Sequence, residues 1–163
     1  MHESMLVQYG PLIAAGAILL SAALASVFAY VQIRTHKKIA QRRATLDLLV
    51  QKEWDADYIA AKHEFNLLRD AEAGLGPWAA PQHRNSPQQK NIRSTLNDYE
   101  LIAIGISKDI IDEDVYKTWF RGSLLKDWAA AAPFVRQIRA SENNPKIYIE
   151  LETLAVRWGR SPA

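Results

Sequence analysis

The chain is 163 residues long, with 23% charged and 48% hydrophobic side chains, a formal net charge of +2 and no cysteine. This composition excludes a collagen-like chain, a disordered chain and a small scaffold held together by disulfides. The length allows about one domain, and the 120 residues after position 43 are enough to enclose one compact core.

An apolar stretch near the N-terminus predicts a membrane-spanning helix. Residues 11–33 contain no charged side chain over 23 positions, and a helix of about 20 residues crosses a hydrocarbon core of about 30 Å. Pro11 suits the first helical turn, where its missing N–H has no partner to lose. We therefore expect a short tail over residues 1–10, followed by a transmembrane helix over residues 11–33.

The charges around this stretch argue against a cleaved signal peptide. Such a peptide carries basic residues before a shorter apolar core of about 7–15 residues, whereas here Glu3 precedes the stretch and the basic residues follow it. Basic residues beside a span stay on the cytoplasmic side. We therefore expect a single-pass protein of the inner (plasma) membrane, with its N-terminus outside and its C-terminal part in the cytoplasm.

The basic residues define a juxtamembrane segment, residues 34–43, and we expect them to set the topology and to contact the anionic head groups of the lipid bilayer. Each such contact contributes about 1 kcal/mol. No nucleic-acid partner is expected, because residues 44–163 carry 15 Lys and Arg against 17 Asp and Glu, and so have no net positive charge to offer a phosphate backbone. The basic residues are Arg34, Lys37, Lys38, Arg42 and Arg43.

Four small residues recur at every fourth position within the predicted span and so share one helical face. Small residues at this spacing let two membrane helices approach closely, which predicts a homo-oligomer or docking against a partner's membrane helix. The alternative is chance, because an alanine-rich stretch produces the same spacing without any partner. The four residues are Ala17, Ser21, Ala25 and Ala29.

The rest of the chain, residues 44–163, is expected to form a cytoplasmic helical domain. Its apolar residues recur with the period of a helix, and strand-like alternation is found only in the short run at residues 147–151. Asp55 and Asp112 are suited to cap helices, and a Pro- and Gly-rich loop is expected at residues 74–89. The predicted fold class is therefore all-α, one transmembrane helix followed by a small helical bundle.

Five apolar stripes mark the helices expected in this domain. Because residues 34–68 contain no Gly or Pro, the first helix can continue the membrane helix; a coiled-coil stalk is the alternative, but charged residues interrupt its seam. Pro133 should kink or restart the fourth helix, and Asn144 with Pro145 should open the last. In chain order the stripes are Leu46, Leu49, Val50 and Trp54; Tyr58, Ala61, Phe65 and Leu68; Ile92, Leu96, Tyr99, Ala103 and Ile106; Tyr116, Phe120, Leu124 and Trp128; and Ile147, Leu151, Leu154, Ala155 and Trp158.

Common catalytic and ligand-binding motifs are missing from the sequence. The four histidines are scattered and there is no cysteine, so we expect no metal site, and no cofactor-binding or catalytic residues are assigned. Gly74 and Gly76 form no phosphate cradle, because Pro77 beside them has no amide N–H to donate. An enzyme is therefore the less favoured interpretation.

One set of charged residues borders the predicted stripes. Glu100 lies four residues after Leu96, and Arg139 lies four residues after Val135, so each borders an apolar face. We expect Glu100 to form a semi-buried ion pair with Arg121 or Arg139 that joins two helices. The alternative is catalysis at the membrane surface by Glu100 or Asp98 with the nearby arginines, but structural pairs of this kind are commoner.

Trp78 differs from the aromatic residues of the stripes, because it lies in the expected loop between two prolines. An aromatic side chain in a loop needs a surface to pack on, either its own bundle or a protein partner. We therefore treat Trp78 as a candidate partner contact. Together these features predict a membrane-anchored interaction or adaptor module; the alternatives are the membrane-surface enzyme and a small accessory subunit of a larger membrane complex.

Several runs of residues follow the predicted span in a fixed order: RATLDLL at residues 43–49, LNDYELIAIGI at residues 96–106, and a last helix over residues 148–158. Between the last two runs lie Ile111, Asp112, Tyr116, Trp119 and Trp128. This order resembles an uncharacterised bacterial and prophage family known as domain of unknown function 4760, over nearly the whole chain. The resemblance implies a single-pass protein with a cytoplasmic helical domain and no established activity, so it assigns no functional residues.

Overall fold

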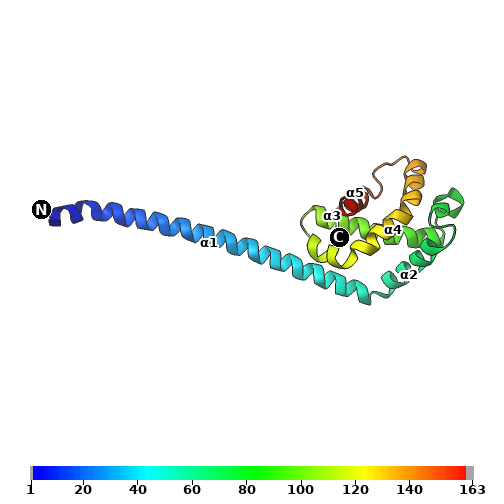
Figure 1. Cartoon of the computed structure of the whole chain (residues 1–163), viewed down its shortest axis with the longest axis horizontal. Helices are drawn as coiled ribbons and strands as arrows, with labels where there is room; N and C mark the ends of the chain where they lie inside the picture. The colour runs from blue at the N-terminus through cyan, green and yellow to red at the C-terminus, as the bar shows by residue number, and fades with distance from the viewer. Residues whose placement is uncertain (1, 161–163) are drawn as a thin grey trace. The chain divides into compact units, whose positions relative to one another are not determined.

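The computed structural model describes residues 2–160, with side chains from residue 14 onward. No strand occurs in this part of the chain, which confirms the all-α prediction, and the strand-like run at residues 147–151 is a turn that leads into a helix. The elements in chain order are α1 (His2–Trp54), α2 (Ala56–Asp70), the 3-10 turns η1 (Gly76–Ala79) and η2 (Pro81–His83), α3 (Pro87–Ser107), α4 (Glu113–Ser141) and α5 (Ile149–Arg160) (Figure 1).

α1 is one uninterrupted helix that contains the predicted span and the first predicted stripe. It begins at His2, so the residues expected to form a tail are helical, and Pro11 lies inside the helix instead of in its first turn. All its side chains from Ala14 to Ala40 are exposed, and this helix is long and apolar enough to cross a membrane. The chain divides into two compact units between Ala40 and Gln41; the second unit is called the helical domain below.

The predicted helix starts at Asp55 and Asp112 are confirmed. The Asp55 carboxylate accepts a hydrogen bond from the N–H of Tyr58 at 2.9 Å. The Asp112 carboxylate accepts one from the N–H of Val115 at 3.0 Å. Each aspartate thus satisfies an amide that has no partner within the first helical turn.

The loop expected over residues 74–89 is shorter than predicted. The turns η1 and η2 occupy its middle, and α3 begins at Pro87. The Ser86 hydroxyl caps α3 by accepting a hydrogen bond from the N–H of Gln89 at 3.2 Å, and Pro87 takes the first helical position, where proline is favoured. The Ser-Pro pair was therefore the start signal of this helix.

Two expected boundaries near the C-terminus are wrong. Pro133 was expected to kink or restart this helix; α4 continues through it, so the restart is wrong, and the kink stays a prediction. The last helix begins at Ile149, five residues after Asn144. Tyr148 adopts a left-handed φ of 57°, which an α-helix does not tolerate, so any helix opened at Asn144 would end there.

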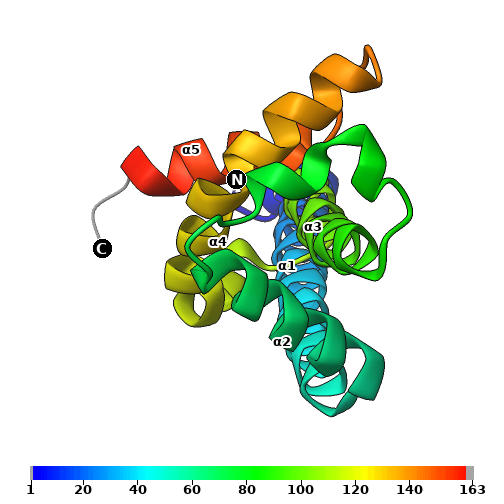
Figure 2. The same cartoon turned by 90° about the vertical axis from the view of Figure 1, so that its right-hand side faces the viewer.

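α3 lies at the centre of the helical domain, packed against α2, α5 and η1 (Figure 2). All five stripe residues predicted for α3 are buried. Each of α2 to α5 contributes a large aromatic side chain to one continuous core, and at about 25 cal/mol per Å² of apolar area this burial is the main stabilising term. These buried aromatic residues include Phe65, Tyr99, Tyr116, Phe134 and Trp158.

The first predicted stripe is wrong in part, because only Leu49 of its four residues is buried. The other three are exposed, Trp54 to 83%. The buried side of this part of α1 carries two polar residues, Gln41 and Thr45, which are hydrogen bonded to the segment between α3 and α4. A pattern of apolar residues alone cannot identify such a face.

Candidate functional site

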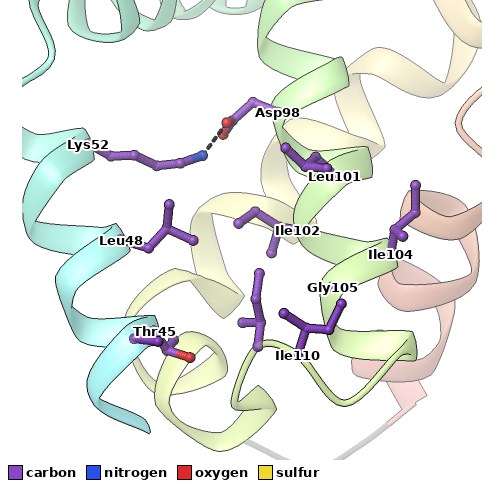
Figure 3. A pocket seen from close by; sticks show the side chains of 11 residues that line it. Thr45, Leu48, Lys52, Asp98, Leu101, Ile102, Ile104, Gly105 and Ile110 are labelled. Carbon is purple, nitrogen blue, oxygen red and sulfur yellow. Dashed lines mark hydrogen bonds and ion pairs between the residues drawn. The ribbon is translucent and has the colours of Figure 1, made fainter. Parts of the chain in front are cut away.

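An apolar groove lies within the helical domain, between the α1 residues from Ala44 to Lys52 and the C-terminal half of α3 (Figure 3). Its volume is about 330 Å³. Leu48 and Ile102 point toward one another across it, and its charged edge is the pair Lys52 and Asp98. This feature is called the α1–α3 groove, and it is lined by Ala44, Thr45, Leu48, Lys52, Asp98, Leu101, Ile102, Ile104, Gly105, Ile110 and Ile111.

Large apolar side chains of the groove are open to solvent. Leu101 and Ile110 are each 66% exposed, and Ile104 is 38% exposed. Single exposed apolar residues are ordinary on protein surfaces, but several that surround one hollow are typical of an interaction site. The α1–α3 groove is therefore the candidate binding surface of the helical domain.

A tight turn after α3 brings the last groove residues into place. The Gly105 carbonyl accepts hydrogen bonds from the N–H groups of Ile110 and Ile111 at 2.9 and 3.1 Å. A Cβ atom on Gly105 would lie 2.6 Å from the Cδ1 atom of Ile111, well inside van der Waals contact. Glycine at this position thus allows the turn to pack directly on α3.

Polar contacts fasten α1 to this same turn. The Gln41 side chain donates to the Asp109 carboxylate at 3.1 Å, and the Asp112 N–H donates to the Thr45 hydroxyl at 2.9 Å. Arg42 forms an ion pair with the fully buried Asp112 carboxylate at 3.3 Å. Arg42 therefore contacts protein, while its side chain stays 54% exposed, and its expected contact with lipid head groups stays a prediction.

The other members of the basic segment lie on the part of α1 around the unit boundary. The Arg34 guanidinium carbon lies 5.6 Å from the centre of the Tyr30 ring, a cation–π distance. For Arg34, Lys37, Lys38 and Arg43, contact with lipid head groups stays a prediction.

The small-residue face of α1 is exposed at Ala17, Ser21, Ala25 and Ala29. The Ser21 hydroxyl donates to the Ala17 carbonyl at 2.8 Å, so it is satisfied within its own helix. Helix association through this face stays a prediction.

A second hollow, of about 370 Å³, adjoins the groove. It shares Asp98 and Leu101 with the groove, and its walls carry three aspartates and no Lys or Arg. Burial and the nearby carboxylates raise the pKa of Tyr58, in its wall, to about 12. This feature is called the acidic hollow, and it is lined by Asp55, Asp57, Tyr58, Ala61, Ser94, Thr95, Asn97, Asp98 and Leu101.

A buried charged cluster joins α2, α3 and α4 around Asp127. The Asp127 carboxylate is fully buried and pairs with Lys62 and Arg69 of α2, and it accepts a hydrogen bond from the Tyr99 hydroxyl at 2.7 Å. Burial lowers the pKa of Lys62, while Asp127 acts in the opposite direction. Burial raises the pKa of Tyr99 well above its ordinary value, and Asp127 adds to this effect.

Sequence reasoning missed Asp127, although one signal was present. Asp127 lies three residues after Leu124 and four before Ala131, so it interrupts a stripe that is otherwise apolar. A carboxylate on a buried face needs cationic or hydrogen-bonding partners, and both of its oxygens have them. The cluster is therefore a structural connection between three helices.

Glu100, expected to form an ion pair with Arg121 or Arg139, contacts the backbone of α5, and the ion pair itself stays a prediction. The two Glu100 oxygens accept hydrogen bonds from the N–H groups of Glu150 and Leu151, at 3.3 and 2.7 Å. Glu100 thus caps the N-terminus of α5, where the helix dipole favours a negative charge.

The two arginines also contact α5. Arg139 forms its ion pair with Glu152 at 2.7 Å and donates to the Ile147 carbonyl at 2.8 Å, and Arg121 donates to the Trp158 carbonyl at 3.0 Å. Glu100, Arg121 and Arg139 therefore have structural contacts, and each one attaches α5 to α3 or α4.

Trp78 lies in η1, is half-buried, and packs against the core of its own domain. Its ring centre lies 4.7 Å from that of His83, and its carbonyl accepts a hydrogen bond from the Gln89 side chain at 2.9 Å. Of the two surfaces considered for Trp78, its own bundle is the one it contacts. A role in partner binding stays a prediction.

Within the residues that the structure describes, no group of three or more His, Asp or Glu side chains is arranged to hold a metal ion. Comparison with curated proteins gave no match, and comparison with solved structures gave none either. A family model described as "Domain of unknown function (DUF4760)" matches residues 18–158. This match covers most of α1 and nearly all of the helical domain, and the chain therefore belongs to the DUF4760 family.

Proposed function

We propose that this protein is a membrane-anchored interaction module whose helical domain binds an apolar segment of a protein partner in the α1–α3 groove. The observation that carries the proposal is the exposure of Leu101, Ile104 and Ile110 around an apolar hollow. Covering these side chains would remove apolar area from water, which stabilises a complex by about 25 cal/mol per Å² before the costs of association.

The carboxylates considered for catalysis support binding over an enzyme. A catalytic acid or base needs a carboxylate that is free to exchange a proton with a substrate. Glu100 uses both oxygens as acceptors for the backbone of α5. Asp98 is paired with Lys52 at the rim of a groove whose other walls are almost wholly apolar.

We also propose that α1 anchors the protein in the inner membrane by a single pass, with the helical domain in the cytoplasm. The support is the exposed apolar surface of α1 from Ala14 to Ile33 and the basic residues that follow it. Alkaline phosphatase fused to the C-terminus should be inactive, because the enzyme matures only in the periplasm, and a C-terminal fluorescent protein should fluoresce. An active phosphatase fusion would show that the orientation is reversed.

Site-specific photocrosslinking in living cells tests the groove. A photoreactive amino acid at Leu101 or Ile110 should give a discrete protein adduct, whereas the same residue at Leu67 of α2 is the matched control, because Leu67 is exposed to 55% but lies outside the groove. Leu101→Glu should abolish the adduct formed from position 110, and Leu67→Glu should leave it unchanged. Equal adducts from the groove and from position 67 would overturn the proposal.

A further inference from the structure

The α1–α3 groove and the acidic hollow adjoin each other. Asp98 and Leu101 belong to the walls of both, and the ion pair of Lys52 with Asp98 crosses the groove at this end (Figure 3), so an occupant of the groove that extends past Leu101 reaches the hollow beside this pair. The surface therefore changes from apolar to acidic along its length. This change in chemistry restricts what can occupy it.

The acidic hollow is negative and only partly compensated. Lys52 is paired with Asp98 and its ammonium lies 5.1 Å from the centre of the Tyr58 ring, while the Asp55 carboxylate accepts the Tyr58 N–H. Asp57 is exposed in the first turn of α2. Burial, and after it the charges of Asp98, Glu53 and Asp127, raise the pKa of Tyr58 to about 12.

A further polar group in the wall lacks a partner. Thr95 is only 4% exposed and lines the acidic hollow. Its hydroxyl oxygen has no hydrogen-bond partner in the part of the chain that the structure describes. A buried polar group of this kind costs about 1–3 kcal/mol when left unsatisfied, and because the oxygen is closed to solvent, an occupant would reach it only if the Thr95 side chain turned toward the hollow.

The dimensions of the groove fit a helix. The α1 wall runs from Ala44 to Lys52, which at about 1.5 Å per residue is about 12 Å, or a little more than two helical turns. An apolar groove between two helices is typical of the sites that bind amphipathic helices, whose anchors lie at positions i, i+3, i+4 and i+7.

We infer that the occupant is an amphipathic helix of a partner protein that carries a Lys or Arg one turn beyond its apolar anchors, with the anchors in the α1–α3 groove and the cation at Asp57 and Asp98. This inference rests on the proposed function. It adds a rule of recognition, because an apolar helix that ends in an acidic residue would meet like charge in the hollow, and like charges disfavour a complex.

The test uses the full-length protein in phosphatidylcholine nanodiscs, which carry no net lipid charge to attract a basic peptide. The probes are fluorescent helical peptides with leucines at i, i+3, i+4 and i+7 and either a lysine or a glutamate on the next turn, placed at the N-terminal end in one pair and at the C-terminal end in another. Fluorescence anisotropy measures their affinities. In one of the two pairs, the lysine peptide should bind roughly tenfold more tightly than the glutamate peptide at low salt, and this preference should shrink as salt screens the charges.

Matched variants distinguish the inferred preference for a cation from the proposed binding of a helix in the groove. Asp57→Asn should abolish most of the preference for lysine, while Asp114→Asn should preserve it, because Asp114 also lies in the first turn of a helix but outside the hollow. Asp98→Asn is a second test of the hollow, and Leu101→Glu should abolish the binding of every peptide. Retention of the preference in Asp57→Asn and Asp98→Asn would overturn the inference.

The remaining outcomes are also decisive. Equal binding of the lysine and glutamate peptides, lost in Leu101→Glu, would overturn the inference but leave the proposed function standing. Binding of none of the peptides would count against both. Uptake of a fluorescent fatty acid that Leu101→Glu abolishes, with no peptide bound, would identify a lipid chain as the occupant and refute a protein partner.

Discussion

Replacing Asp127 with asparagine would test the role of the buried charged cluster. The substitution conserves size but removes the charge that pairs with Lys62 and Arg69, whose side chains are only 19% and 11% exposed. Removing one partner of a buried ion pair costs about 3–5 kcal/mol, because the other charge is left uncompensated. A domain of this size is stabilised by about 5–15 kcal/mol in total, so this is a large fraction of its free energy of unfolding.

Thermal and urea unfolding of the full-length protein in nanodiscs, followed by circular dichroism of the helical domain, would measure this loss. We expect Asp127→Asn to lower the midpoint temperature by roughly 10–20 °C, given about 3–5 °C per kcal/mol for a domain of this length. Asp114→Asn is the control, because Asp114 is exposed, and it should change stability by less than about 1 kcal/mol. Adding Lys62→Met to Asp127→Asn should recover part of the loss, since it removes one uncompensated cation.

Two results would refute this reasoning. A loss below about 1 kcal/mol in Asp127→Asn would mean that water reaches the cluster and screens it as it does a surface pair. A double variant that is less stable than Asp127→Asn alone would mean that Lys62 stabilises the domain through packing and not through its charge.

Three further predictions follow. Glu100→Gln should destabilise α5 by about 1–2 kcal/mol, seen as faster hydrogen exchange at the amides of Glu150 and Leu151 and not in α2; unchanged exchange would exclude the capping role. Because the folded state raises the pKa of Tyr58 from 10.0 to about 12, it holds that proton more tightly than the unfolded state does, and stability falls by about 1.4 kcal/mol per pH unit as the pH rises from 10 to 12. Tyr58→Phe should remove this contribution from the slope of stability against pH, while Lys62, whose pKa is lowered, still contributes a slope of the opposite sign. The same slope in Tyr58→Phe as in the unaltered protein would contradict the role of Tyr58. Ser21→Leu with Ala25→Leu should weaken self-association in a membrane two-hybrid assay, and no change would argue that the small residues are there by chance.

Helix positions were predictable from the sequence where the signal is local. The caps at Asp55 and Asp112 were recognised because the capping oxygen and the amide it accepts are three residues apart. The stripe of α3 was recognised because apolar residues three and four apart share a helical face. The start of α5 was missed because it depends on the left-handed backbone of Tyr148, for which a tyrosine is not a signal.

The candidate site was less predictable, because it is made by residues distant in the sequence. The groove joins α1 to α3 and to the turn after α3, so no single run of residues has its pattern. Exposed apolar residues such as Leu101 and Ile110 are indistinguishable in the sequence from residues of the core. Only packing decides which of them are left uncovered.

The sequence by itself determined the helical character of the chain, its long apolar N-terminal helix and the core faces of α3 and α5, because these depend on contacts within about four residues and on the burial of apolar area. The tertiary structure decided the partners of the charged residues. Glu100 caps a helix 50 residues away, and Asp127 pairs with a lysine 65 residues away. A buried charge takes whichever opposite charge or amide the packed helices bring within reach, and that proximity is created by the fold and not by spacing along the chain.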